Sequence, residues 1–422
     1  MATVAEYRIK VQEEEKSMSS SNKSIIRLME YSWFSQFYAG PNPWMARYVY
    51  GLIFLAANLL AWAIRDYGQS ALTEVKRLKE CHGGSNCLGT EGVLRVSLGC
   101  FVSSSIDKTF YITMFLSTVG TKRLHGNRDA WHSGWWSAKI VMCIGLMVLP
   151  FFLPTTLIHL YGEIAHFGAG IFLLIQLISI ISFIMWLNKC CHSEKCARDG
   201  RFHVKSLSMA SYVTCIVGVI LLYIWYAPQL SCILNILFIT VTLLLLHLMT
   251  LVSLNPRINA GLLAPGLMGL YIVFICWCAI RSEPPTETCN KNLCVNACLY
   301  AVSDKLIMVS LSFFLRQSFV IAVLAMVIAT FSTGIDSESF QFRKDEKQGD
   351  DDVPYGYGFF HFVFAMGAMY FAMLLIGWNT HHIMKKWTID VGWTSTWVRI
   401  VNEWLAACVY SKYLFAPAVY LL

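Results

Sequence analysis

The stretch Ile233–Val252 reads ILNILFITVTLLLLHLMTLV and decides the fold class of the chain. It contains no Asp, Glu, Lys or Arg. A helix needs about 20 mostly apolar residues to cross the hydrocarbon core of a bilayer, and this stretch meets that length. The period-2 alternation of a barrel strand is absent from it and from two similar runs, Ile171–Trp186 and Phe319–Phe331. The sequence therefore predicts an all-α, polytopic membrane protein.

The composition of the whole chain supports this class. Of 422 residues, 56% are hydrophobic and 14% are charged, against about 25% charged in an average soluble domain. Candidate spans lie at residues 46–65, 92–119, 138–158, 163–187, 205–226, 232–252, 260–280, 314–333, 356–378 and 397–420. A soluble core could not hide so much apolar surface, so lipid must surround most of the chain.

Two stretches fit this scheme less well. Polar residues from Ser103 to Lys108 interrupt the second span, so they either face a wet interior or form a loop. The stretch 293–333 is too long for one span. It could hold a long helix, an interfacial helix or an extra crossing, and an extra crossing would invert the topology of everything after it.

The basic residues predict the orientation. The net charge of +7 does not indicate nucleic-acid binding, because the basic residues lie in short loops between apolar runs. The first 24 residues of the N-terminal tail 1–45 are polar and lack the apolar stretch of a signal peptide. With that tail in the cytosol, Lys and Arg are in excess in the inner loops, as expected. Ten spans then place the C-terminus in the cytosol as well. The predicted location is the endomembrane system or the plasma membrane.

The topology sorts the cysteines. The outer side, where disulfides can persist, holds Cys81, Cys87, Cys289, Cys294 and Cys298. A bridge between Cys81 and Cys87 would close a small loop, but the odd number leaves the pairing open. Cysteines and a histidine at 190–196 match no zinc spacing, so no metal site is expected there.

Several long motifs identify a resemblance. They read FLSTVGTKRLHGNRDAWHSGWW at 115–136, PTTLIHLYGEIAHFGAG at 154–170, SLNP at 253–256, FSTG at 331–334, PYGY at 354–357 with FHF at 360–362, and GWTSTWVRIVNEW at 392–404. From about residue 40 to 410 the chain resembles the Serinc (serine incorporator) family, and its plant members most. Residues 103–113, 293–316 and 411–422 depart from the family pattern.

The resemblance implies both a fold and a role. The fold would be ten transmembrane helices in two bundles, joined by a long tilted helix that corresponds to the fourth span. The role would be to bring serine into phosphatidylserine and sphingolipid synthesis, with phospholipid scrambling in some animal relatives.

Three ionisable residues open the fourth span. The spacing of His159, Glu163 and His166 places them on one face of a helix. Ionisable groups inside a membrane are candidates for function, here for binding a lipid headgroup or serine. The alternative is that they lie at the interface, satisfied by water and neighbouring helices. A metal site would need a second Glu and His pair on another helix, and the sequence offers none.

The last span carries a second polar group. Arg399 and Glu403 are four residues apart and can pair on one helical face, with Asn402 beside them. These residues are candidates either for structural pairing near the interface or for contact with substrate.

No catalytic signature or cofactor motif is found in the chain. We therefore expect a non-enzymatic protein, without cofactor, that handles serine or serine-derived lipids. The expected partners are membrane phospholipids, with serine and lipid-synthesis enzymes as further candidates. The alternatives are a secondary transporter of a small solute such as serine, and a structural protein whose inner acidic loop 336–352 binds a trafficking adaptor through residues 345–352.

Overall fold

The described part of the chain is built from helices. The computed structural model describes residues 43–68, 87–101, 110–121, 123–124, 126–191, 200–256, 261–284, 289, 304–335, 353–379 and 387–419. Its helices are α2 (Pro43–Tyr67), α4 (Cys87–Phe101), α5 (Phe110–Thr118), α6 (Asn127–Ser133), α7 (Trp136–Val148), η3 (Leu149–Phe152), α8 (Thr155–Cys191), α9 (Gly200–Tyr226), α10 (Ile233–Leu254), α11 (Leu263–Arg281), α13 (Asp304–Ile335), α14 (Tyr357–Ile376) and α15 (Trp393–Val419). The all-α prediction is confirmed.

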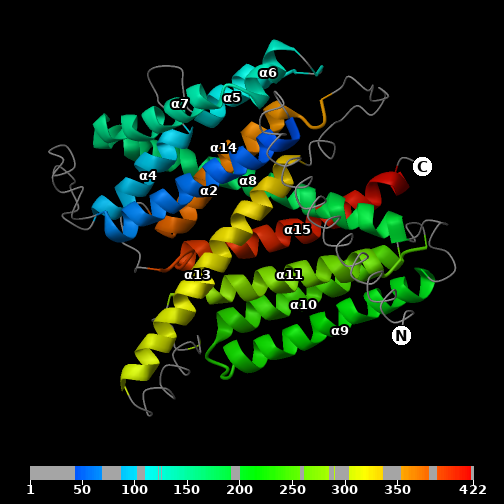
Figure 1. Cartoon of the computed structure of the whole chain (residues 1–422). Coiled ribbons are helices and arrows are strands. Elements are labelled where there is room, and N and C mark those ends of the chain that lie inside the picture. Colours follow the sequence, from blue (N-terminus) through cyan, green and yellow to red (C-terminus); the bar gives the residue numbers. More distant parts are fainter. Residues whose placement is uncertain are drawn as a thin grey trace, which may run out of the picture.

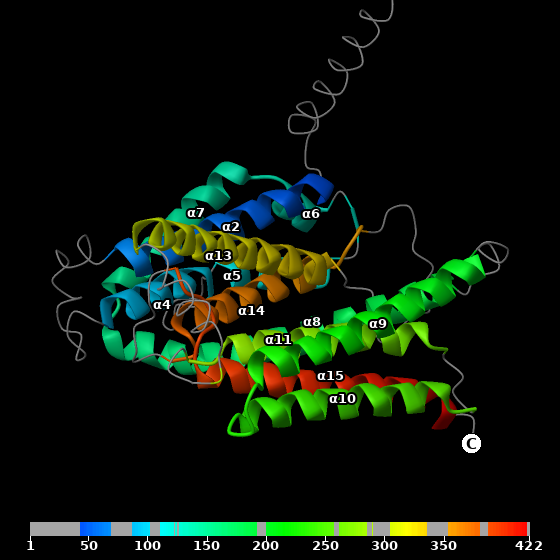
Figure 2. The ribbon, with the colours of Figure 1, turned by 90° about the horizontal axis from the view of Figure 1, so that it is seen from below.

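The helices form two bundles (Figures 1 and 2). One hydrophobic core is shared by α2, α4, α5, α7, α13, α14 and the first half of α8. A second core is shared by α9, α10, α11, α15 and the last part of α8. The 37-residue α8 belongs to both, with Phe172 in the first core and Leu177 and Ile181 in the second. Two bundles joined by one long helix are therefore what the structure shows.

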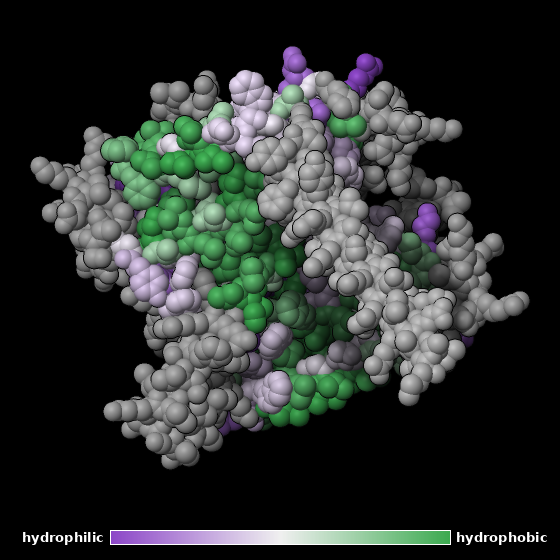
Figure 3. Space-filling model, in the orientation of Figure 1, coloured by the Kyte–Doolittle hydropathy of each residue, from purple (hydrophilic) through white to green (hydrophobic). Residues whose placement is uncertain are grey.

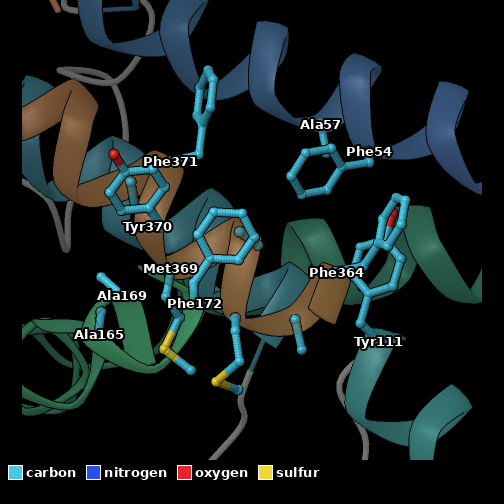
Figure 4. Packing of buried hydrophobic residues seen from close by; sticks show 14 of the residues in the cluster. Phe54, Ala57, Tyr111, Ala165, Ala169, Phe172, Phe364, Met369, Tyr370 and Phe371 are labelled. Atoms are coloured by element: carbon cyan, nitrogen blue, oxygen red, sulfur yellow. The ribbon is translucent and has the colours of Figure 1, made fainter. Parts of the chain in front are cut away.

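Helix α14 forms the centre of the first bundle. It is apolar and buried on nearly every side, as expected of a helix in a bundle core. Figure 4 shows its Phe364 beside Phe54 and Tyr111, with the Phe54 and Phe364 ring centroids 5.1 Å apart. On the α8 side the helices approach closely, since a Cβ on Gly168 would lie 2.1 Å from the Met369 sulfur.

The outer faces of the bundles are apolar, which suits helices surrounded by hydrocarbon. Large hydrophobic side chains such as Leu244, Leu248 and Leu251 of α10 are exposed, and Figure 3 shows broad hydrophobic areas on the described surface. Among the described residues, six helices are long and apolar enough to span a membrane, or seven if the bent pair α6 and α7 with η3 is one span. The predicted count of about ten is not confirmed. One reason is that the second predicted span is divided between the short α4 and α5.

The boundary between the third and fourth predicted spans was wrong. The chain breaks around Pro150 and Pro154, so α7 ends at Val148 and α8 begins at Thr155, because proline removes a backbone donor and clashes with the preceding turn. The buried Arg95 of α4 binds the carbonyl oxygens freed at this break, those of Pro150 and Leu153. Its ion pair with Glu91 neutralises the charge.

The long stretch 293–333 resolves into one helix over its described part, because α13 runs without a break from Asp304 to Ile335. Residues 293–303 and the acidic loop 336–352 lie outside the described residues.

A disulfide joins Cys289 to Cys232, at the start of α10. Cys232 was not among the candidates. Two helices, α10 and α11, separate these cysteines in the chain, and two crossings return the chain to the same side of a membrane. Cys81, Cys294 and Cys298 lie outside the described residues, and the side chain of Cys87 does too.

Candidate functional site

The three candidates on α8 lie toward the surface of that helix. His159 and Glu163 are exposed, whereas the opposite face, which includes Tyr161 and Ala165, is buried in the first core. His166 is half-buried. Its ring lies between two carbonyl oxygens, with Nδ1 2.8 Å from that of Gly162 and Nε2 3.2 Å from that of Trp378. Of the three, His166 therefore reaches the segment that follows α14.

Arg399 pairs with Asp390 rather than with Glu403, so the predicted Arg399–Glu403 pairing was wrong. The guanidinium Nε donates to the Asp390 carboxylate over 2.5 Å, and a second nitrogen also contacts it. The direction of helical side chains explains this choice. Side chains on a helix lean toward its N-terminus, so Arg399 reaches back to the segment before α15, while Glu403 lies one turn further along.

The same segment is anchored to α2. Arg65 forms an ion pair with Asp66, its Nε 2.7 Å from the carboxylate. Its Nη1 donates to the carbonyl oxygens of Leu375 at 2.7 Å and Thr388 at 2.9 Å. The Asp66 carboxylate also accepts a hydrogen bond from the backbone N–H of Trp387 at 2.9 Å. Both side chains of the pair are buried, so they hold the end of the first bundle against the chain that enters the second.

The backbone of this segment is unusual. Trp378, Trp387 and Asp390 have φ values of 59°, 63° and 56°, in the left-handed region that costs roughly 1–3 kcal/mol for a residue other than glycine. Hydrogen bonds hold it there. The Asp390 N–H donates to Leu374 O at 2.8 Å, and the Gly392 N–H donates to Ser282 O, at the end of α11, at 2.7 Å. Such strain persists only where the surroundings fix it, and it tends to mark functional positions.

We call this region the junction, because it links α2 and α14 of the first bundle to α11 and α15 of the second. It consists of Arg65, Asp66, His166, Tyr370, Trp378, Asp390 and Arg399. Tyr370 connects its two halves: its ring lies 6.1 Å from that of Trp378, and its hydroxyl is close enough to Arg399 for an electrostatic interaction. The Arg399 side chain is 27% exposed, so a charged group from outside can reach it.

The remaining two candidates lie deeper in the second bundle. Asn402 is buried and forms a hydrogen bond with the hydroxyl of Tyr271 of α11. Glu403 is buried against Thr242 of α10, the two oxygens 2.7 Å apart. Neither residue faces the surface, so neither joins the junction.

The prediction missed a second polar group, at the opposite end of α14. We call it the histidine cluster. It consists of the buried residues Tyr50, Asp129, His132, Lys139, Tyr355, Tyr357 and His361. Its members come from α2, α6, α7 and α14, except for Tyr355, which lies two residues before α14. The motifs at 115–136 and 354–362 supply all of them except Tyr50 and Lys139.

Hydrogen bonds order the imidazole rings of the histidine cluster. His132 Nε2 lies 2.9 Å from the Tyr355 hydroxyl, and that hydroxyl donates to Pro43 O at 3.1 Å. His132 must then donate through Nε2, so its Nδ1 accepts from His361 Nε2 over 3.1 Å. This series of hydrogen bonds ends at His361 Nδ1, a buried acceptor without a partner in the described structure.

Among the described residues, Lys139 of the histidine cluster forms no ion pair with a carboxylate. Its Nζ donates to His132 O at 2.8 Å and lies over the rings of Tyr50, Trp131 and Trp136, at 4.5–5.4 Å from their centroids. Aromatic faces attract a cation and replace a counter-ion here. His, Tyr and Asp at the ends of apolar runs were the available signal, but only the fold shows that two distant motifs meet.

No group of three or more His, Cys, Asp or Glu side chains in the described residues could hold a metal ion. The contacts described in both polar regions are hydrogen bonds, ion pairs and aromatic contacts.

Comparison with known proteins identifies the family. The model of the serine incorporator (Serinc) family matches residues 29–348 and 331–421. The chain belongs to the Serinc family. It is 27% identical to a probable serine incorporator of Dictyostelium discoideum over 366 residues, which cover 79% of this chain and 81% of that protein.

Two further relatives match over almost their full length. A probable serine incorporator of Nematostella vectensis is 24% identical and covers 90% of this chain and 91% of its own. Serine incorporator 3 of Mus musculus is 22% identical and covers 90% of this chain and 92% of its own. The Serinc family, together with the apolar helices, makes this chain an integral multi-pass membrane protein.

Proposed function

We propose that this protein is a non-enzymatic membrane protein that handles serine or serine-derived lipids and so supports phosphatidylserine and sphingolipid synthesis. In its most concrete form, it lowers the cost of moving a polar lipid headgroup across the bilayer at the junction between its two bundles. Family membership and the names of its relatives, serine incorporators, support the link to serine.

The observation that carries the lipid version is the charge at the junction. The headgroup of phosphatidylserine bears a phosphate, a carboxylate and an ammonium group. Arg399 is partly exposed and offers a planar set of donors suited to phosphate or carboxylate. Glu163, exposed on α8 about one turn before His166 of the junction, offers an acceptor suited to ammonium. Bringing such partners to the edge of the hydrocarbon offsets part of the cost of desolvating a charge there.

Reconstitution into liposomes tests this proposal. Fluorescently labelled phosphatidylserine would be placed in both leaflets and the outer label destroyed by an impermeant reductant. We expect the protected fraction to fall in vesicles that contain the protein, relative to empty vesicles made in parallel. Protection equal to that in empty vesicles would refute lipid transfer.

A secondary transporter of serine is the second candidate. The bend of 66° between α6 and α7 with η3, at a short break, favours it, because transporters of this kind use interrupted helices. Uptake of radiolabelled serine into the same proteoliposomes distinguishes the two functions.

A structural role that depends on an adaptor at 345–352 predicts instead that deleting these residues changes the location of the protein and leaves lipid movement intact.

A further inference from the structure

The core of the second bundle contains an acidic side chain that is buried without a cationic partner in the part of the chain that the structure describes. Glu403 of α15 is fully buried. One of its carboxyl oxygens, Oε1, lies 2.7 Å from the hydroxyl of Thr242 on α10. The other, Oε2, is buried and has no hydrogen-bond partner in the described structure.

Four other buried carboxylates of the described chain are compensated by partners. Asp66, Glu91 and Asp390 each form an ion pair with an arginine. Asp129 accepts from the hydroxyls of Tyr357 and Ser133. Among the described residues, Glu403 forms no ion pair.

The hydrogens around Thr242 indicate which form Glu403 takes. The Thr242 Oγ1 atom is 2.8 Å from the carbonyl oxygen of Phe238 and 2.7 Å from Glu403 Oε1. A hydroxyl has one hydrogen to give, and the Phe238 carbonyl can only accept. Both bonds form together only if the carboxyl of Glu403 is protonated and donates to Thr242.

The energies favour the same form. A neutral carboxyl leaves one carbonyl-type oxygen unsatisfied, at a cost of about 1–3 kcal/mol. A carboxylate would be buried without a counter-ion or a second donor, which costs several kcal/mol or more. The neutral acid is therefore the more stable state in this core.

The neighbouring helices supply no charge to reverse this result. On α11, the thiol of Cys276 interacts electrostatically with Glu403, and the phenol of Tyr271 binds Asn402. Glu283, buried just after α11, is acidic and cannot offset a negative charge at Glu403. Helix α10 presents Thr242, while its His247 is exposed on the outer face. Helix α8 contributes apolar residues such as Leu177 and Ile181. On α15 itself, Arg399 is already paired with Asp390.

We propose that Glu403 is a proton-binding site within the membrane, which carries its proton at neutral pH. A movement of α10 against α15 that opened Oε2 to water would transfer that proton to water and leave a carboxylate. The ligand is thus a proton, whichever solute the junction handles, and the site gives the second bundle a means of coupling its packing to pH.

Infrared spectroscopy of the reconstituted full-length protein tests the site. At pH 7 we expect a carbonyl stretch of a protonated carboxylic acid that Glu403→Gln removes. The matched control is Glu163→Gln, an exposed glutamate of α8, which should leave that band in place. If Glu403→Gln instead removes only carboxylate absorption, the proposal is wrong.

Thermal unfolding in detergent gives an independent reading. Gln is isosteric with a protonated Glu and keeps a donor for Thr242, so Glu403→Gln should unfold close to the wild-type temperature at pH 7, and Glu403→Ala well below it. Equal losses in the two variants would overturn the proposal. If neither variant folds, Thr242→Val decides, because losing the acceptor should shift the carbonyl band to higher frequency, and an unchanged band contradicts the assignment.

Discussion

The two ends of α14 hold their polar groups in different ways. At its start, the histidine cluster is a hydrogen-bonded chain of imidazoles and phenols around a lysine in an aromatic cage. At its end, the junction uses ion pairs, carbonyl oxygens and a left-handed backbone. The first closes one bundle on itself, whereas the second joins two bundles and leaves Arg399 partly exposed. From this difference we expect that binding at the junction, rather than at the histidine cluster, would alter the arrangement of the bundles.

The largest effect is expected at the buried ion pair of the junction. Arg65→Met leaves Asp66 charged and buried and removes the donor for Leu375 O and Thr388 O. Breaking one partner of a buried pair costs about 3–5 kcal/mol. Thermal unfolding in detergent measures it, and Arg65→Met/Asp66→Asn should recover part of the loss. Equal stability of the single variant and the wild type would show that this pair does not hold the bundles together.

The histidine cluster should respond less, and unequally at its two rings. His132→Ala deprives both Tyr355 and His361 of a partner, which costs about 1–2 kcal/mol for each and about 2–4 kcal/mol in all. His361→Phe breaks one of these bonds and also removes the partnerless Nδ1, so its cost should be smaller. The two unfolding temperatures check the order. A greater loss for His361→Phe would contradict the direction of the hydrogen-bond chain.

The smallest effect is expected at the exposed edge of the junction. Asp390→Asn removes the charge that pairs with Arg399 but keeps a side chain that tolerates the left-handed backbone. Because Arg399 is partly solvated, the loss should be about 1–2 kcal/mol, and added salt should weaken the wild type toward the variant. An unfolding temperature that is independent of salt in both proteins would exclude a charge contribution.

The sequence predicted the class of fold because its signal is local. An apolar run as long as Ile233–Val252 is most stable as a helix that crosses a lipid bilayer. The boundary between the third and fourth spans was misplaced, because the predicted third span ran past the break at Pro150 and Pro154. The resemblance implied the two bundles, and the span of α8 across both cores bears this out.

The polar sites were harder to predict from the sequence, because each side chain's partner lies far away along the chain. Spacing alone paired Arg399 with Glu403, but the partner of Arg399 is Asp390, brought close by a left-handed turn that spacing does not reveal. Nor could spacing bring His132 to His361, which are 229 residues apart. Cys289 was correctly placed among residues able to form a disulfide, yet its partner Cys232 is the first residue of the predicted span 232–252 and was overlooked.

Lipid movement measured side by side in two variants tests the central claim, that the junction and not the histidine cluster handles the headgroup. Arg399→Gln and His361→Phe would be reconstituted at equal amounts of folded protein, and the flipping of labelled phosphatidylserine compared with the wild type. We expect Arg399→Gln to lower the rate several-fold and His361→Phe to leave it near that of the wild type. A normal rate in Arg399→Gln, or an equal loss in both variants, would contradict this assignment.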